Sequence, residues 1–230
     1  MEIRFLQHVP FEGPAQIADW AAEQGHRIAV TRLDLGAPPP EIDTFDWLIV
    51  LGGPMNIYEE ARYPFLGPEK ACIRRAIDAG KAVLGLCLGA QLAADILGGR
   101  VVRNAHREIG WHPIESIDTA GTPLAGLPSP VTAFHWHGDM FEPPPKARLL
   151  ARSEACPHQA FLYGDRVLGL QFHLEYDRPT IRAMLHHCAD ELAPGPYVQT
   201  AEAIERQADH VETLRPYLFD ILDRLAAAAR

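Results

Sequence analysis

The chain has 230 residues, 47% of them hydrophobic and 22% charged, which is ordinary for a globular protein and enough for one domain with a complete core. Its formal net charge of −9 argues against nucleic acid or an anionic membrane surface as the main partner. The apolar run from Ala82 to Ala94 is too short to span a bilayer, so no membrane partner is expected. The four cysteines show neither disulfide-like nor metal-like spacing, which favours a reducing cytoplasm.

The first half of the chain alternates between predicted strands and predicted helices. Strands are expected over Ile3 to Gln7, Arg27 to Leu33 and Trp47 to Leu51, and helices over Pro14 to Gln24 and Glu69 to Ala79. A glycine directly follows each helix, where it would end it. This alternation predicts an α/β fold with a mostly parallel, doubly wound sheet.

A cysteine stands between the next predicted strand, Ala82 to Leu86, and a predicted helix, Leu88 to Leu97. Gly85 and Gly89 flank it symmetrically, which suits the crowded turn called a nucleophile elbow. Such a turn places the side chain beside a helix N terminus, where free N–H groups and the helix dipole favour a thiolate. Cys87 is therefore the candidate nucleophile. The alternative is a buried cysteine followed by a helix-capping glycine.

From about Val101 to Phe172 the pattern changes to short strands joined by Gly and Pro turns. This predicts an antiparallel or mixed extension of the sheet. His135 and His137 share one face of a predicted strand, and two such imidazoles are a zinc-binding type of pair. Because no third ligand stands in register, we expect a surface or core role for both, with no metal site and no cofactor.

A second run of chemical interest begins in the predicted buried strand Val167 to Phe172 and ends in His173-Leu174-Glu175. A cysteine nucleophile needs a base, and the base needs a partner that holds its orientation. His173 and Glu175 are two residues apart, so in an extended segment their side chains leave on the same face. Since the carboxyl ends of parallel strands open onto one edge of a sheet, we expect Cys87 and His173 to lie close together.

After about residue 178 the chain is predicted to be helical, with a break at Pro194-Gly195-Pro196. We take this break as the boundary between an α/β domain, residues 1–193, and a helical extension packed on it, residues 194–230. The last helix carries one apolar stripe at helical spacing: Leu214, Leu218, Ile221, Leu222 and Leu225. We expect this stripe to pack on the chain's own domain; the alternative is a homodimer or partner surface.

Three segments then match a known family in its own order: Gly52-Gly53-Pro54, Gly85-Leu86-Cys87-Leu88-Gly89-Ala90-Gln91 and Gly169-Leu170-Gln171-Phe172-His173-Leu174-Glu175. Weaker matches are Glu108-Ile109-Gly110-Trp111 and Trp136-His137-Gly138-Asp139. On these segments the chain resembles the class I (triad-type) glutamine amidotransferases, in particular stand-alone proteins similar to the amidotransferase half of GMP synthase. The resemblance covers roughly residues 45 to 176. It implies a flavodoxin-like, doubly wound mixed sheet with C-terminal helices.

The resemblance also implies a reaction on glutamine or another small γ-glutamyl amide. Cys87 would attack the γ-amide carbon, His173 would protonate the leaving nitrogen and then activate water, and Glu175 would hold the imidazole. The backbone N–H groups of Leu88 and Gly53 would form the oxyanion hole. The alternatives for Gly52-Gly53-Pro54 are a tight turn without a ligand and a phosphate loop, and the second is disfavoured because neither a G-x-G-x-x-G nor a Walker-type pattern is present.

Two further residues are implied as substrate ligands. Gln91, one turn into the elbow helix, would bond the amino-acid end of glutamine, and Asp139 would bind the α-ammonium group. The role of Gln91 follows from the family's matching glutamine, and its polar side chain in an otherwise apolar helix agrees with this. Asp139 is assigned because its segment, Trp136-His137-Gly138-Asp139, is expected to follow a strand.

The reaction leaves two versions open. One is an amidotransferase whose ammonia serves a separate synthetase subunit, since no nucleotide-binding Ser-Gly-Gly-type loop follows residue 176. The other is a stand-alone γ-glutamyl peptidase or hydrolase. A DJ-1-like module is a third interpretation, but those proteins usually place a histidine directly after the cysteine, where Leu88 stands here. A silent binding module is disfavoured by the intact set of Cys87, His173 and Glu175.

Overall fold

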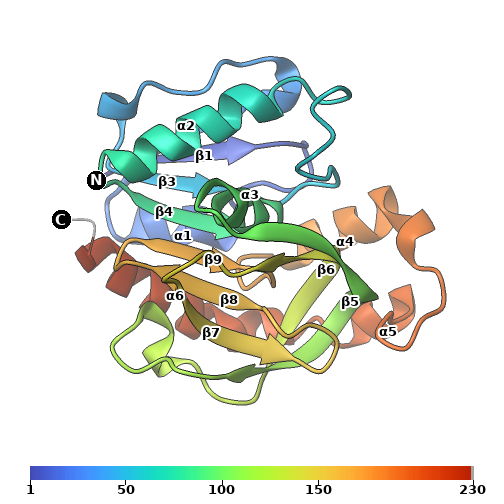
Figure 1. Ribbon diagram of the computed structural model, residues 1–230. Coiled ribbons are helices and arrows are strands. Elements are labelled where there is room, and N and C mark those ends of the chain that lie inside the picture. The colour runs from blue at the N-terminus through green and yellow to red at the C-terminus, as the bar shows by residue number, and fades with distance from the viewer. Residues whose placement is uncertain (229–230) are drawn as a thin grey trace.

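The computed structural model describes residues 1–228, and within them nine strands form one sheet in the order β2-β1-β3-β4-β9-β8-β7-β5-β6 (Figure 1). The strands are β1 (Glu2–Gln7), β2 (Arg27–Arg32), β3 (Trp47–Val50), β4 (Ala82–Leu86), β5 (Arg100–Ser116), β6 (Val131–Glu142), β7 (Arg148–Ser153), β8 (Ala160–Tyr163) and β9 (Val167–Leu170). The α-helices are α1 (Gln16–Glu23), α2 (Leu66–Asp78), α3 (Leu88–Ile96), α4 (Arg178–His187), α5 (Ala201–Arg206) and α6 (His210–Ala228).

The half of the sheet made of β2, β1, β3, β4 and β9 is parallel throughout. Its strand order corresponds to the 2-1-3-4-5 order of flavodoxin-like sheets, with β9 as the fifth strand. The inner strands are continuous apolar runs, such as Trp47–Val50, because helices cover both of their faces. The predicted flavodoxin-like, doubly wound fold is confirmed.

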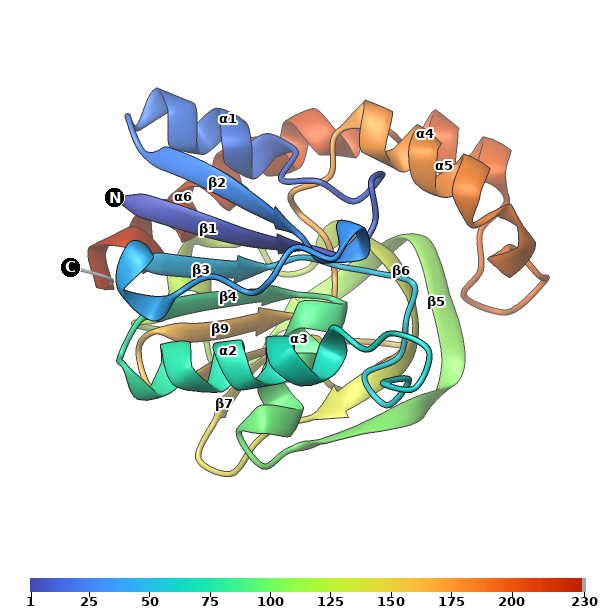
Figure 2. The same cartoon turned by 90° about the horizontal axis from the view of Figure 1, so that it is seen from above.

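The helices lie on the two faces of this parallel half (Figure 2). Helices α2 and α3 cover one face, where their apolar side chains join Leu48, Val50 and Val83 in one buried cluster. Helices α1 and α6 cover the other face, where Trp20 and Trp47 pack edge to face in a second cluster. The core is therefore two apolar layers with the sheet between them.

The other half of the sheet, β8, β7, β5 and β6, is antiparallel, as expected. The expectation of short strands is wrong for two of them, since β5 has 17 residues and β6 has 12. Gly110 and Pro113 do not interrupt β5, because both pair with β6 inside the ladder. The segment Trp136 to Asp139 therefore lies inside β6 and not after a strand.

The last helix, α6, packs its apolar stripe against the sheet. The side chains of Leu214, Leu218, Ile221, Leu222 and Leu225 are all buried, in the same cluster as β1, β3 and β4. This stripe is consequently not a free surface for a homodimer or another partner. The division of the chain at residue 194 remains a prediction. Among residues 1–228, no helix combines the length and apolar character that a membrane crossing requires.

Candidate active site

Cys87 occupies the sharp turn between β4 and α3. Its backbone has φ 50° and ψ −103°, a strained conformation for a residue with a side chain. The flanking glycines are required by crowding: a Cβ on Gly85 would lie 2.4 Å from the Gly89 oxygen, and one on Gly89 would lie 2.1 Å from the Val50 oxygen. The turn is thus packed against both helix and neighbouring strand, and Cys87 is held at the N terminus of α3.

His173 and Glu175 follow β9 along the same edge of the sheet. Strand β9 ends at Leu170, and the next residues continue as an irregular segment whose His173 backbone bridges to Phe134 of β6. The Nδ1 of His173 lies 2.6 Å from Glu175 Oε1, and both side chains are 1% exposed. The ring of Tyr176 stacks on the imidazole with centroids 4.0 Å apart, which restricts its rotation.

The charge state of His173 follows from these neighbours. Burial alone would lower its pKa, but the charge of Glu175 and the interaction with the Cys87 thiol raise it to about 10. The imidazole is therefore an imidazolium at neutral pH. A cationic imidazole and a helix N terminus are the surroundings in which cysteine nucleophiles are generally found.

The other three cysteines are buried and electrostatically different. Burial raises the pKa of the Cys156 and Cys188 thiols to about 12, and that of Cys72 above its ordinary value. Among the described residues, no imidazole ring is among the groups that shift these three pKa values; of His158, the Cys156 thiol contacts only the backbone oxygen, at 3.4 Å. Cys87 is therefore the cysteine with nucleophilic surroundings.

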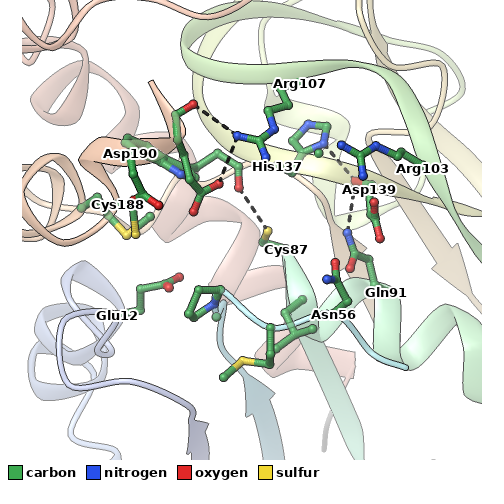
Figure 3. A pocket seen from close by; sticks show the side chains of 18 of the residues that line it. Glu12, Asn56, Cys87, Gln91, Arg103, Arg107, His137, Asp139, Cys188 and Asp190 are labelled. Carbon is green, nitrogen blue, oxygen red and sulfur yellow. Dashed lines mark hydrogen bonds and ion pairs between the residues drawn. The ribbon is translucent and has the colours of Figure 1, made fainter. Parts of the chain in front are cut away.

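Cys87 opens into a cavity of about 330 Å³ (Figure 3). On one side of the sulfur lie Asn56, Gln91, Arg103 and Asp139; on the other lie Glu12, Cys188 and Asp190. The first side carries one carboxylate and one guanidinium, from Asp139 and Arg103, which pair across the ladder of β5 and β6. An α-ammonium and an α-carboxylate are complementary to that pair of charges.

Gln91 and Asp139 are joined by direct contacts. The Gln91 side-chain amide donates to the Asp139 backbone oxygen at 3.2 Å, and Tyr58 donates its hydroxyl proton to the Asp139 carboxylate at 2.9 Å. Gln91 also donates to Gln171 Oε1 at 3.3 Å, and Gln171 Nε2 lies 3.6 Å from Cys87 Sγ. The structure therefore brings both predicted substrate ligands to the wall of the cavity that holds Cys87.

The two predicted oxyanion donors also meet at this cavity. Leu88 begins α3, so its N–H is one of the free N–H groups at a helix N terminus. Gly53 lies beside it: a Cβ on Gly53 would be 3.1 Å from Leu88 Cδ2 and 2.6 Å from Met55 Sδ. Within residues 1–228, no backbone acceptor takes the Gly53 N–H.

A buried histidine–glutamate pair behind this turn was not anticipated from the sequence. His8 Nδ1 donates to the Gly52 carbonyl oxygen at 2.8 Å, and His8 Nε2 lies 2.8 Å from Glu69 Oε1. Burial would lower the pKa of His8, but the charge and hydrogen bond of Glu69 raise it above its ordinary value. In a trans peptide the C=O and the following N–H point in opposite directions. The contact from His8 to Gly52 thus sets where the Gly53 N–H points.

Glu12 and Tyr176 form a further contact that the sequence did not suggest. Tyr176 donates its hydroxyl proton to Glu12 Oε2 at 2.6 Å, and a Cβ on Gly52 would lie 2.3 Å from that oxygen and 3.3 Å from His173 Cε1. Burial raises the pKa of Glu12. Both His8 and Glu12 follow the carboxyl end of β1, so the sheet-edge rule used for Cys87 could have identified them.

The expectation that His135 and His137 lack a third ligand in register is wrong. Glu108 pairs directly with His137 across the ladder of β5 and β6, and its Oε2 lies 3.2 Å from His137 Nε2 and 3.5 Å from His135 Nδ1. Burial would raise the pKa of Glu108, but His135, His137 and Ser153 lower it to about 2. Burial lowers the pKa of His135 to about 3, against the opposing charge of Glu108.

Comparison with known proteins finds similarity to glutamine amidotransferases over most of the chain. Residues 15–189 match the family described as glutamine amidotransferase class-I. The glutamine amidotransferase-like protein YfeJ of Salmonella typhimurium is 35% identical over 236 residues, covering 99% of this chain and 98% of that protein. A crystal structure of a glutamine amidotransferase from Methylobacillus flagellatus has a TM-score of 0.92 at 30% identity, covering 99% of this chain and 94% of that one.

Relatives of a second kind are longer than this chain. The GMP synthase of Thermomicrobium roseum is 37% identical over 131 residues, which are 56% of this chain but 23% of that protein. The match therefore spans about a quarter of that synthase.

Proposed function

This chain belongs to the class I glutamine amidotransferase family, which acts on the amide of glutamine, and on that basis we propose that it hydrolyses this γ-amide through a γ-glutamyl thioester on Cys87. One observation supports the proposal above all: the thiol of Cys87, which lies in a strained turn, interacts with the imidazole of His173. That imidazole is paired with Glu175, and the thiol opens into the cavity. This arrangement has the nucleophile, the base and the orienting carboxylate that acyl transfer by a cysteine requires.

The reaction begins with attack of the Cys87 thiolate on the γ-carbonyl carbon, which forms a C–S bond and places the negative charge on the oxygen. The His173 imidazolium gives its proton to the amide nitrogen, the C–N bond breaks, and ammonia leaves. The neutral imidazole then takes a proton from water, which attacks the thioester and releases glutamate and the thiolate. Glu175 holds the ring by its Nδ1 through both steps.

The developing oxyanion requires donors that are already in place. We assign the backbone N–H groups of Leu88 and Gly53 to this role because both border the cavity beside Cys87. His8 is the positioning residue for the second donor, since its bond to the Gly52 oxygen directs the shared peptide plane. Glu69, fully buried on the other side of the ring, raises the pKa of His8 and restricts its rotation.

Glutamine itself would bind with its α-amino and α-carboxylate groups beside Asp139, Arg103 and Gln91. Asp139 is the ligand for the α-ammonium group, because its carboxylate faces the cavity and is held by Tyr58. Arg103 supplies the opposite charge for the α-carboxylate. This orientation places the γ-amide toward Cys87.

Two uses of the reaction follow. In the first, a separate synthetase subunit consumes the ammonia. In the second, the chain cleaves larger γ-glutamyl compounds by itself. The cavity favours testing this second use, because it continues past Cys87 to Glu12 and Asp190 on the side away from Gln91. That continuation is where a leaving group larger than ammonia would lie.

The proposal is tested by measuring glutamate release from glutamine and from γ-glutamyl dipeptides, with Cys87→Ser as the matched control. Release from either substrate that disappears in Cys87→Ser is the expected result. Turnover retained by Cys87→Ser would contradict the proposed chemistry. Turnover of dipeptides above glutamine would select the hydrolase, and turnover of glutamine alone would select the amidotransferase.

A further inference from the structure

The cluster of Glu108, His135 and His137 is not used by the proposed reaction. It lies on the paired strands β5 and β6, and the two histidines stand directly before and after Trp136 along β6. All three side chains are 0–1% exposed. One ligand atom from each of them lies within 4.8 Å of the other two. Buried charges and imidazoles grouped in this way need either a proton or a cation to compensate them.

The distances suit one kind of cation. Glu108 Oε2 lies 3.2 Å from His137 Nε2 and 3.5 Å from His135 Nδ1. In a tetrahedral zinc site with bonds of about 2.0–2.2 Å, neighbouring ligand atoms are about 3.3–3.6 Å apart. Two of the three spacings are therefore close to those that such an ion imposes, and all three ligand atoms lie within 4.8 Å of one another.

The hydrogen-bonding roles of His137 point the same way. Its Nδ1 lies 3.1 Å from the backbone oxygen of Asp139, which can only accept, so Nδ1 carries a proton. In the neutral ring Nε2 is then a lone pair, and it faces an oxygen of the Glu108 carboxylate. Two acceptors at this distance repel each other unless a positive charge lies between them.

The surroundings of the other two ligands agree with this assignment. His135 Nδ1 lies 3.5 Å from the Gln159 amide nitrogen, a donor, and 3.5 Å from Glu108 Oε2, while His135 Nε2 has no partner within the described residues, so the ring proton can sit on Nε2 and leave the Nδ1 lone pair toward the cluster. Glu108 Oε2 accepts from Ser153 Oγ at 3.0 Å and from Gln159 Nε2 at 2.7 Å. Metal-bound carboxylates and imidazoles are commonly held by such outer hydrogen bonds.

We propose that Glu108, His135 and His137 bind one divalent transition-metal ion of the zinc type. Two imidazoles and one carboxylate are a ligand set that zinc takes with a fourth position open. His137 lines the cavity, so an ion can reach the cluster from there. The two histidines flank Trp136, whose backbone oxygen lies 3.7 Å from Cys87 Sγ, so the ion would brace the strand that borders the nucleophile.

The experiment is a metal titration of the full chain after removal of metal with a chelator. Cobalt(II) is added first and followed by its visible absorption, and zinc is then added to displace it. Retained zinc is measured by elemental analysis after dialysis. The variants that should lose the site are His135→Asn and Glu108→Gln, and both are checked by circular dichroism.

Two control variants separate this site from others. His112→Asn removes a ring whose centroid lies 5.9 Å from that of His135 but that is not a member of the cluster. Cys87→Ser removes the thiol that could bind zinc independently. Both controls should retain about one equivalent of zinc, as the unmodified chain does, while His135→Asn and Glu108→Gln should bind more than about 10-fold more weakly.

The inference does not depend on the proposed reaction, because every readout is metal binding. A chain that binds no cobalt or zinc would overturn it and leave an imidazolium–carboxylate pair in the cluster. Loss of zinc in Cys87→Ser, or full retention in both site variants, would overturn it as well. If a site variant fails to fold, the titration of the unmodified chain and of Cys87→Ser still decides the question.

Discussion

Two buried histidine–glutamate pairs lie near the Gly52 turn. They differ in the group that the histidine contacts besides its glutamate: a thiol in one pair and a backbone carbonyl oxygen in the other. His173 pairs with Glu175 at 2.6 Å and interacts with the Cys87 thiol. His8 pairs with Glu69 at 2.8 Å, and its other nitrogen donates to a backbone oxygen. In the proposed reaction, the same pair of side chains serves proton transfer where it meets a thiol, and peptide positioning where it meets a carbonyl.

Removal of the first histidine should have the largest effect. His173→Ala eliminates the base and the leaving-group acid, so turnover should fall by about 1000-fold or more while the fold is kept. Steady-state kinetics with circular dichroism would measure this. A variant that retained a tenth of the activity would remove His173 from the mechanism.

Changes of the second histidine should give a smaller, graded loss. His8→Leu frees the Gly52 peptide, so kcat should fall about 10- to 100-fold with little change in KM. In His8→Asn the side-chain amide can still donate near the position of Nδ1, so much of the rate should return. Equal loss in both variants, or a loss confined to KM, would mean that His8 has no role in aligning the Gly53 N–H.

Substitutions on the side of the cavity proposed to bind substrate should change KM more than kcat. Asp139→Asn keeps the shape but removes the charge proposed to bind the α-ammonium, so KM should rise by about 10-fold or more with a smaller change in kcat. Tyr58→Phe, which removes only the hydroxyl bound to Asp139, is the matched weaker variant. An unchanged KM in Asp139→Asn would place the amino-acid end of the substrate elsewhere.

The smallest expected effect is on stability: the His173–Glu175 pair should make the free energy of unfolding depend on pH. The pKa of His173 is raised from 6.5 to about 10, so its pairing stabilises the fold fully below pH 6.5 and this contribution is lost as the pH rises toward 10. The unmodified chain should therefore exceed Glu175→Gln in free energy of unfolding more at pH 6 than at pH 10. Urea unfolding at both values measures this, and a constant difference would contradict it.

Much of the site could be predicted because its signals are local. Cys87 stands between two glycines at a junction of strand and helix, and crowding on both sides explains both glycines. His173 and Glu175 needed only their spacing of two residues and the rule that parallel strands end at one edge. Each of these inferences uses a short segment whose structure its own sequence determines.

The rest depended on contacts between distant segments. His8 and Glu69 are 61 residues apart, and nothing in α2 marks Glu69 as buried. Glu108 faces His137 because the register of β5 and β6 shifts between Arg103 and Glu108, an irregularity that no local pattern reveals. Gly110 and Pro113 suggested that β5 would be short, because both residue types commonly interrupt strands, whereas pairing with β6 retains both in the ladder.

The central claim is that Cys87 is the residue acylated by a γ-glutamyl group, and labelling tests it most directly. A glutamine analogue with an electrophilic carbon in place of the amide is added to the full chain at neutral pH, and labelled peptides are mapped by mass spectrometry. We predict one adduct on Cys87, with glutamine slowing its formation and His173→Ala preventing it. Labelling of Cys72, Cys156 or Cys188 ahead of Cys87, or labelling that glutamine does not slow, would contradict the account.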